Sequence, residues 1–363
     1  MYISNRSQQI NSSGIRRVFD LAAKLKDPIN LSIGVPDFDA PKELIDGACN
    51  ALNSRKSGYT QTQGIEPLRE KLRLKYKIDS GSDLDVFLSS GVSGGLFLSY
   101  MSILDPGDEV VIPDPFFCMY RDLALLINAN PVTFNTYPSF RYDPEEIERV
   151  ITPKTRAIVV NTPGNPTGTS ISSEDLKGVI EIAKKHDLWI IYDELYEFFS
   201  YDKPHQSIVG MYDKVIILNG FSKSHGIPGW RAGYVVAPSK LVQAMLKIQQ
   251  YTFVCTPSVT QWAIAENFDI DLGPYVDPYL EKGDLIYNGL KDKYEVMKPD
   301  GAFYVFPKAP NGDGDKFVDL CIENNLLVVP GSAFSNRNTH FRISFSAPLS
   351  VIERGVEVLR KLA

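Results

Sequence analysis

Seven apolar runs between residues 84 and 237 constrain the fold of this 363-residue chain more than any other feature. Most lack polar alternation, which is typical of strands covered on both faces. Helical stretches separate most of them, for example residues 174–186, where Ser172 and Asp175 form a possible capping box. The predicted strands are residues 84–88, 109–112, 131–134, 157–161, 188–192, 215–218 and 233–237.

This alternation predicts an α/β fold with a mostly parallel sheet flanked by helices. The segment between the last two runs is too short for a helical crossover, so the last strand is expected to be antiparallel. We predict a large domain at residues 36–270. Residues 1–35 and 271–363 are expected to form a smaller α+β domain, with an N-terminal helix at 15–26, capped by Ser12 or Ser13, packing on the C-terminal unit.

Composition excludes several classes of function. The formal net charge of -6 leaves no basic footprint, which argues against nucleic acid as a partner. No apolar run reaches the length of about 18 residues that a membrane helix needs, and the polar start of the chain lacks a signal-peptide core. The scattered cysteines and histidines show no metal-ligand spacing, so we expect a cytoplasmic protein with reduced cysteines and no metal site.

Candidate functional residues follow the predicted strands, because a parallel sheet of this kind binds ligands at the carboxyl ends of its strands. The turn Gly91-Val92-Ser93 could bind a phosphate at a helix N-terminus, or be only a structural turn. Phe117 follows the next strand and is either core or a stacking surface for a planar ring. Asn165 lies in a loop rigidified by two prolines and two glycines, and could point its amide into the crevice.

Two further strand ends carry charged groups. Asp193 directly follows an apolar run, where a carboxylate is either a helix N-cap or the partner of a cation or a protonated ring nitrogen. Tyr196 would lie on the same side of the following turn. Lys223 follows the run at 215–218, and such a lysine can lose its proton and form an imine with a carbonyl. Arg231 suits a phosphate, or makes a surface ion pair. Together these groups match pyridoxal 5'-phosphate.

Three motifs then carry a resemblance over essentially the whole chain: PGNPTG at 163–168, DELY at 193–196 and FSKSHGIPGWRAGY at 221–234. The chain resembles the class I/II aminotransferases of fold type I, of the aspartate aminotransferase-like kind. The resemblance implies that Lys223 forms the imine with the cofactor and shuttles the Cα proton. It implies that Asp193 pairs with the pyridine nitrogen, while Tyr196 and Asn165 hydrogen-bond the phenolic oxygen. The implied phosphate and ring contacts come from Gly91, Val92, Ser93, Ser222, Arg231 and Phe117.

The same resemblance implies a homodimer in which Tyr59 reaches the phosphate of the partner subunit. Arg342 resembles the arginine that binds the substrate α-carboxylate, and Gly34 resembles a glycine near that carboxylate. Two departures stand out. Gly220 occupies a position where many members have serine, which removes one phosphate hydrogen bond, and Phe117 replaces a frequent tryptophan. The peptide bonds before Pro115 and Pro166 match positions that are often cis in the family.

The expected reaction is amino transfer between an L-amino acid and a 2-oxo acid, with a 2-oxoglutarate-type acceptor and an aspartate or aromatic or apolar donor. A C–S β-lyase using the same groups is the alternative, and a cofactor-binding regulatory protein is a remote one. No second arginine can be placed for a side-chain carboxylate. Phe97, Tyr100 and Met101, in the helix after the phosphate turn, suggest an apolar donor unless they belong to the core.

Overall fold

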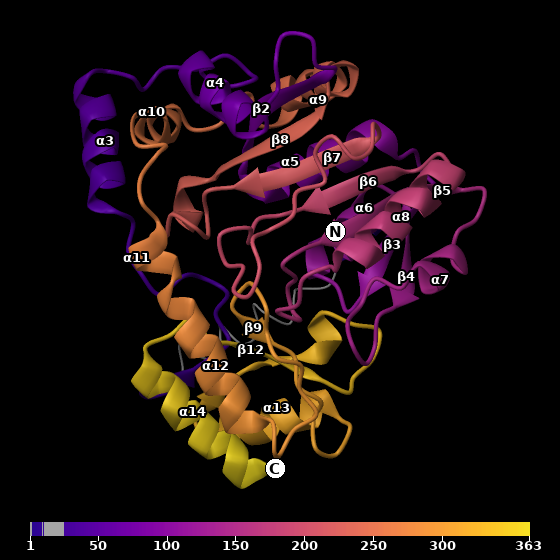
Figure 1. The fold of residues 1–363 in the computed structure, drawn as a ribbon, viewed down its shortest axis with the longest axis vertical. Helices are drawn as coiled ribbons and strands as arrows, with labels where there is room; N and C mark the ends of the chain where they lie inside the picture. The colour runs from indigo at the N-terminus through magenta and orange to yellow at the C-terminus, as the bar shows by residue number, and fades with distance from the viewer. Residues whose placement is uncertain (1, 9, 11–24) are drawn as a thin grey trace.

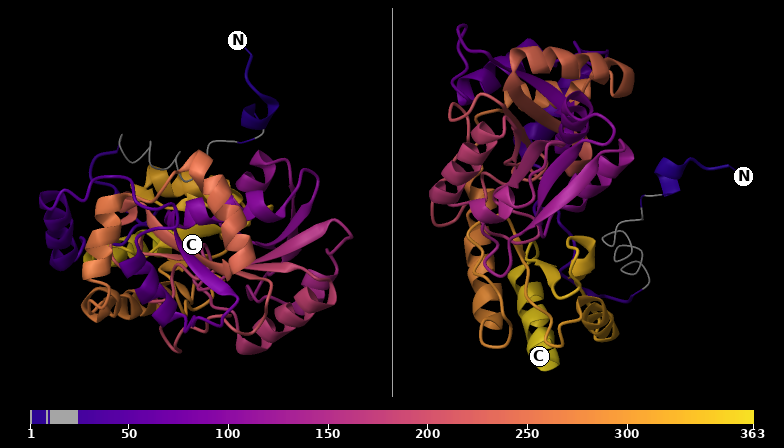
Figure 2. Two further views of the ribbon diagram at one scale, coloured as in Figure 1. Left: turned by 90° about the horizontal axis from the view of Figure 1, so that it is seen from above. Right: turned by 90° about the vertical axis from the view of Figure 1, so that its right-hand side faces the viewer.

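The computed structural model describes residues 2–8, 10 and 25–363. The predicted helix at 15–26, with its caps Ser12 and Ser13, lies almost entirely outside these residues. Figure 1 shows a twisted sheet with helices on both faces above a smaller unit of short strands and long helices. Figure 2 places the short N-terminal helix α1 (Asn5–Gln8) at the periphery and the C-terminus at the far end of the smaller unit.

Within the described residues the main sheet has seven strands in the order β2-β8-β7-β6-β5-β3-β4. Strand β8 runs antiparallel to both β2 and β7, while the other strands run parallel to one another, which confirms the predicted antiparallel strand. Every predicted run forms a strand. The strands are β2 (Leu84–Ser90), β3 (Glu109–Asp114), β4 (Asn130–Asn135), β5 (Thr155–Asn161), β6 (Trp189–Asp193), β7 (Val215–Gly220) and β8 (Ala232–Pro238).

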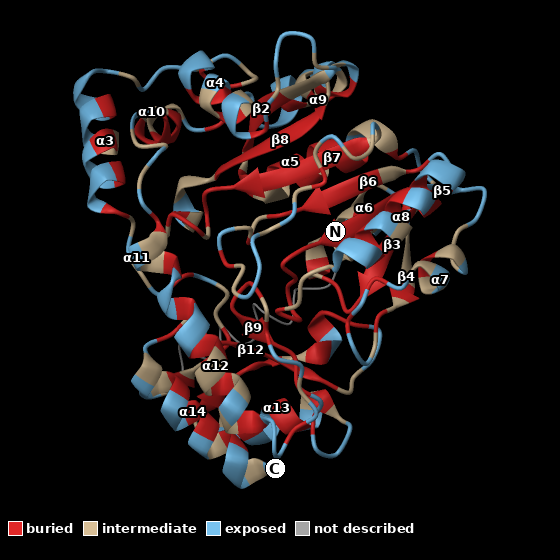
Figure 3. Ribbon diagram, in the orientation of Figure 1, coloured by how far each residue is buried: buried red, intermediate tan, exposed pale blue. Residues whose placement is uncertain are grey.

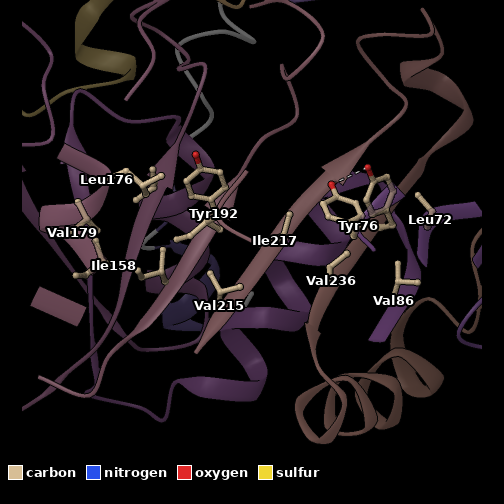
Figure 4. Packing of buried hydrophobic residues seen from close by; sticks show 14 of the residues in the cluster. Leu72, Tyr76, Val86, Ile158, Leu176, Val179, Tyr192, Val215, Ile217 and Val236 are labelled. Atoms are coloured by element: carbon tan, nitrogen blue, oxygen red, sulfur yellow. Dashed lines mark hydrogen bonds between the residues drawn. The ribbon is translucent and has the colours of Figure 1, made fainter. Parts of the chain in front are cut away.

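Helices cover both faces of this sheet, and neighbouring side chains of one strand therefore enter different cores. Ile217 packs into the core beneath one set of helices, whereas Ile216 packs into the core on the opposite face. The first set is α3 (Lys42–Asn53), α4 (Glu66–Lys75), α7 (Pro144–Glu148), α8 (Ser173–Lys185) and α10 (Ser258–Glu266). The second is α5 (Gly91–Ile103), α6 (Cys118–Leu126) and α9 (Ser239–Thr252). Figure 3 shows the buried strands between these partly exposed helices, and Figure 4 shows side chains of the first core.

The predicted capping box of α8 forms only in part. The Ser172 hydroxyl accepts a hydrogen bond from the Asp175 amide at 3.0 Å, as expected for an N-cap. The Asp175 carboxylate, however, accepts two hydrogen bonds from Arg141, at 2.6 and 3.0 Å. A neighbouring arginine therefore replaces the local partner that the sequence pattern suggested.

The smaller unit has its own hydrophobic core, which includes Phe303, Phe317 and Phe341. One of its small sheets has the order β11-β12-β9, and β1 pairs with β10 in parallel. The predicted strand at 327–329 is divided between two sheets, because β10 pairs with β1 and β11 with β12. The elements are β1 (Ile29–Asn30), α11 (Gly273–Val276), α12 (Pro278–Leu290), β9 (Tyr304–Val305), α13 (Gly314–Glu323), β10 (Leu326–Leu327), β11 (Val329–Pro330), β12 (Phe341–Ser344) and α14 (Leu349–Leu362).

Candidate active site

The carboxyl ends of the parallel strands meet at a cavity of about 280 Å³. Segments from both units line it, so residues far apart in the sequence come together there. Eleven of the residues predicted from the sequence contribute to its wall: Gly34, Val92, Ser93, Phe117, Asn165, Asp193, Tyr196, Ser222, Lys223, Arg231 and Arg342. Gly91 directly precedes Val92 in the phosphate turn.

Lys223 supplies the amine of the cavity. It lies just beyond β7, and its Nζ donates a hydrogen bond to the Gly34 carbonyl oxygen at 2.6 Å. Burial, together with the positive charges of Arg342 and Arg231, lowers the pKa of Lys223 to about 8. With this pKa about one tenth of the amine is neutral at pH 7, far more than for an ordinary lysine, and the neutral form is the one that attacks a carbonyl or accepts a proton.

Asp193 is the last residue of β6 and is buried. Burial raises the pKa of Asp193 to about 6, although two hydrogen bonds favour its charged form. The Tyr120 hydroxyl donates to Oδ2 at 2.7 Å, and the Leu195 amide donates to Oδ1 at 3.2 Å. No cation is within ion-pair distance of this carboxylate among the described residues. A buried carboxylate of this kind is set up to receive a protonated group from a ligand.

The turn at Gly91 opens helix α5 with free backbone amides. Gly91 has φ +66°, and a side chain there would lie 2.6 Å from the Arg231 guanidinium, so only glycine lets the arginine approach the turn. Among the described residues no side chain caps this end of α5, so the first amides, including those of Val92 and Ser93, are available to an anion. Arg231 itself donates to the carbonyls of Pro228 and Ser90.

Asn165 and Arg342 form one hydrogen-bonded unit across the two parts of the chain. Arg342 Nη1 donates to Asn165 Oδ1 at 3.0 Å, and Nη2 donates to the Ser32 carbonyl at 2.7 Å. The guanidinium also lies over the rings of Tyr304 and Phe334, each 4.6 Å away. Its Nε is buried without a hydrogen-bond partner among the described residues. An oriented arginine with a donor to spare suits a carboxylate ligand.

The remaining predicted residues differ in their exposure. Phe117 is half-buried at the start of α6 and packs edge to face against Tyr120, with ring centroids 5.9 Å apart. Tyr196 is buried, and its hydroxyl shares a hydrogen bond with Tyr304 at 2.9 Å. Tyr59 does not line the cavity of its own chain, and it is 90% exposed. The peptide bonds before Pro115 and Pro166 are cis, as expected.

Several residues of the site were not found from the sequence. Tyr120 follows Phe117 by three residues on a helix, and that spacing could have suggested it. Asn161 ends a predicted strand and lines the cavity, so the strand-end rule could have included it. Ser32 and Tyr304 lie in segments that read simply as extended chain, and no local pattern indicated their contacts.

The structure decides between the two interpretations of Phe97, Tyr100 and Met101, because none of them lines the cavity. Tyr100 is buried in the core beneath the sheet, and its hydroxyl donates to the Tyr120 carbonyl. Phe97 packs against Phe253, and Met101 is 42% exposed. Only the first turns of helix α5, up to Leu96, contribute to the lining, and these three residues lie farther along the helix.

Comparison with known proteins decides the family. The family model described as "Aminotransferase class I and II" matches residues 26–359. The chain belongs to this family. It is therefore an aminotransferase, and the fold and enzyme class expected from the three motifs are confirmed. The regulatory-protein alternative is not supported by this match.

Individual relatives agree with the family over nearly their whole length. The chain is 38% identical to a probable aspartate aminotransferase of Methanocaldococcus jannaschii, covering 99% of each protein. It is 34% identical to aromatic-amino-acid aminotransferase 2 of Thermococcus litoralis, covering 100% of this chain and 98% of the relative. Among solved structures, the aspartate aminotransferase of Thermotoga maritima superposes with a TM-score of 0.93 at 33% identity, covering 99% of each chain.

Class I and II aminotransferases use pyridoxal phosphate, and the donor set of this cavity fits that cofactor. A neutral amine, a buried carboxylate without a cation and a turn with free amides correspond to its aldehyde, ring nitrogen and phosphate.

The structure also gives a reason for the glycine at position 220, where many members of the family have serine. A side chain there would lie 3.0 Å from the Ala232 carbonyl and from the Gly233 Cα, where β7 and β8 come close together.

The described residues show neither a metal cluster nor a membrane span. No group of three or more His, Cys, Asp or Glu side chains among them could hold a metal ion. No described helix combines the length and apolar character that crossing a membrane would require.

Proposed function

We propose that this aminotransferase moves an amino group between an L-amino acid and a 2-oxo acid, with pyridoxal phosphate held at Lys223. The observation that carries the proposal is the arrangement of one cavity: an amine with a pKa of about 8, a buried carboxylate with a pKa of about 6 and a buried arginine with a spare donor. Bound pyridoxal phosphate would supply an electron sink for negative charge that develops at the substrate Cα.

Each residue has a defined task in this proposal. The neutral amine of Lys223 accepts the Cα proton and returns it, as a general base and then a general acid. Asp193 would pair with the ring nitrogen of the bound cofactor and hold a proton there. Tyr196 and Asn165 donate to the phenolic oxygen. Arg342 binds the substrate α-carboxylate, and Asn165 and the Ser32 carbonyl fix its orientation before the substrate arrives.

The phosphate is assigned to the turn at Gly91, the amides of Val92 and Ser93, Ser222 and Arg231. The last two lie on the same segment as Lys223, so one stretch of chain binds both ends of the cofactor. Phe117 provides the stacking surface, and Gly34 lies next to the carboxylate site through the hydrogen bond between its carbonyl and Lys223. These assignments rest on the lining of the cavity and on the family motifs.

For substrates we propose a 2-oxoglutarate-type acceptor and an aspartate or aromatic or apolar donor. The names of the relatives include both aspartate and aromatic aminotransferases. Among the described residues, the arginines in the cavity wall are Arg231 and Arg342, and both already have assigned ligands. The wall also contains Val35, Met119 and Leu195, which favour an apolar side chain.

We also propose a homodimer in which Tyr59 reaches the site of the partner subunit. Its loop is held to the main sheet, because the Leu88 amide donates to the Gln63 carbonyl at 3.0 Å, yet the Tyr59 side chain projects almost fully into solvent. Tyr251 is 91% exposed. Exposed aromatic residues of this kind are typical of subunit interfaces. Sedimentation of the purified protein tests the dimer.

Two organisational proposals complete the picture. The separate hydrophobic core of the smaller unit supports a division into a large domain at 36–270 and a small domain built from 1–35 and 271–363. The four free cysteines are compatible with the reducing cytoplasm, where we propose that the enzyme acts.

The decisive experiment mixes the purified protein, loaded with pyridoxal phosphate, with single amino acids and follows its visible spectrum. Donors that convert the cofactor to its amine form identify themselves, and 2-oxo acids should reverse the change. Lys223→Ala should fold but lose the conversion, whereas Lys214→Ala, which removes a lysine at the opposite end of β7, should retain it. Turnover by Lys223→Ala would contradict the proposal. Release of pyruvate and ammonia from a cysteine conjugate would favour the lyase instead.

A further inference from the structure

Tyr304 connects three residues of the candidate site and has no role in the function proposed above. It is buried at the start of β9, and its hydroxyl lies 2.9 Å from the Tyr196 hydroxyl. Its ring lies beneath the Arg342 guanidinium, 4.6 Å from the ring centroid. A side chain on Gly34 would come within 2.5 Å of the Tyr304 hydroxyl, so only glycine leaves space for it.

The backbone around Tyr304 is also fixed. Its carbonyl lies against Gly168 of the PGNPTG motif, where a side chain would approach that oxygen to 2.0 Å. The Gly168 carbonyl accepts hydrogen bonds from the amides of Asp300 and Gly301, at 3.0 and 3.1 Å. The Tyr304 hydroxyl is therefore held next to Tyr196 by contacts that do not depend on a ligand.

We propose that Tyr304 is a positioning residue: its hydroxyl donates to the Tyr196 oxygen and thereby leaves the Tyr196 proton free to be donated to the cofactor. This inference rests on the proposed role of Tyr196. One proton must lie between the two oxygens, and a phenol that gives its proton to Tyr304 has none left for a ligand. When Tyr304 donates to Tyr196, the hydrogen bond from Tyr196 to the cofactor also becomes stronger, because hydrogen bonds in series polarise one another.

The charges around the pair favour this direction. Arg342 lies over the ring of Tyr304, where a cation stabilises a partial negative charge on the phenol oxygen. Burial raises the pKa of both phenols, that of Tyr196 well above its ordinary value, and Arg342 opposes this rise at both, while it is the Tyr304 ring that faces the guanidinium. The negative charge of Asp193 also raises the pKa of Tyr196. Tyr304 is therefore the stronger acid of the two and the better donor.

The test is a spectroscopic pH titration of the holoenzyme, without substrate. The visible band of the cofactor, when it is bound to Lys223 as an imine, reports whether the imine nitrogen carries a proton. A stronger hydrogen-bond donor to the phenolic oxygen of the cofactor lowers the pKa of this imine. Tyr304→Phe retains the ring beneath Arg342 and removes only the hydroxyl. We expect the pKa of this band to rise by about half a unit to one unit, the equivalent of one ordinary hydrogen bond.

Two further variants make the result specific. Tyr196→Phe should raise the same pKa by more, and the double variant should match Tyr196→Phe alone, because Tyr304 acts only through Tyr196. Tyr294→Phe is the matched control: it removes a buried hydroxyl that donates to the Leu359 carbonyl at 2.6 Å, away from the cavity, and should leave the band unchanged.

The outcomes separate the inference from the function on which it rests. An unchanged or lowered pKa in Tyr304→Phe, with a raised pKa in Tyr196→Phe, overturns the inference and leaves the proposed role of Tyr196 intact. Additive shifts in the double variant also overturn it, since Tyr304 would then act by another route. If Tyr196→Phe itself leaves the band unchanged, the role assigned to Tyr196 fails, and the inference fails with it.

Discussion

Asp193→Asn should make the cofactor-free protein more stable at neutral pH while abolishing amino transfer. Burial raises the pKa of Asp193 from 3.8 to about 6. Folding therefore disfavours the charged carboxylate. The difference between the pKa values of the folded and unfolded states corresponds to a loss of about 3 kcal/mol of folding stability at pH values well above 6. Asparagine carries no charge and avoids this cost. One of the two hydrogen bonds from Tyr120 and Leu195 loses its acceptor, which costs about 1 kcal/mol.

The pH dependence provides the sharper test. The unfolded chain releases the Asp193 proton near pH 4 and the folded protein only near pH 6, so this group makes the wild type less stable as pH rises through that window. Above about pH 7 its contribution is constant. We expect the free energy of unfolding of Asp193→Asn to exceed that of the wild type by about 2 kcal/mol at pH 7.5. At pH 5 this excess should be smaller by about 1 kcal/mol.

Urea unfolding of the cofactor-free proteins at both pH values measures these differences. Asp175→Asn is the matched control, because this aspartate is also buried but is paired with Arg141, so its loss should lower stability at both pH values by about 1 kcal/mol. The reasoning is refuted if Asp193→Asn is less stable than the wild type at pH 7.5. It is also refuted if the gap between the two proteins does not change with pH.

Three other predictions test the ligand sites. Arg342→Lys loses one charge-assisted hydrogen bond and should lower kcat/KM for amino donors by about 10- to 100-fold with an unchanged cofactor spectrum; a spectral change would mean that the cofactor site is disturbed. Gly233→Ala places a side chain 2.5 Å from the Gly91 backbone and should weaken cofactor binding in equilibrium dialysis, whereas Gly229→Ala, with no described atom within 4 Å of the new side chain, should not. The rate of cofactor uptake should rise with pH through a midpoint near 8 as Lys223 loses its proton and should level off about one unit higher, and a rate that is flat between pH 6 and 9 would contradict the lowered pKa.

The main sheet could be predicted from the sequence because its signals are local. The inner strands are apolar runs buried on both faces, such as Val215–Gly220, and turns rich in glycine, proline or polar residues follow them. The antiparallel strand followed from the short connection that ends at Ala232. The motif around Lys223 combines a buried strand, small residues and two charged side chains. Few functions other than imine formation by a lysine require this combination.

The errors arose where the outcome depended on how distant segments pack. Leu96 and Tyr100 lie one turn apart on the same face of helix α5 and both belong to the core on that side of the sheet, yet only Leu96 also lines the cavity. The apolar pattern of the helix does not indicate which of its turns reach the cavity. The partner of Asp175 was likewise a distant arginine in place of the local cap.

The sequence by itself determined which chemical groups stand at the strand ends: the amine of Lys223, the carboxylate of Asp193 and the free amides of the turn at Gly91. Apolar runs and short rigid motifs define these positions within a few residues. Only the tertiary structure decided how the groups are paired and tuned. Tyr120 is 73 residues from Asp193, Tyr304 is 108 from Tyr196, and Ser32 is 310 from Arg342. Burial and charge, which set the pKa values of Lys223 and Asp193, exist only after such distant segments have packed together.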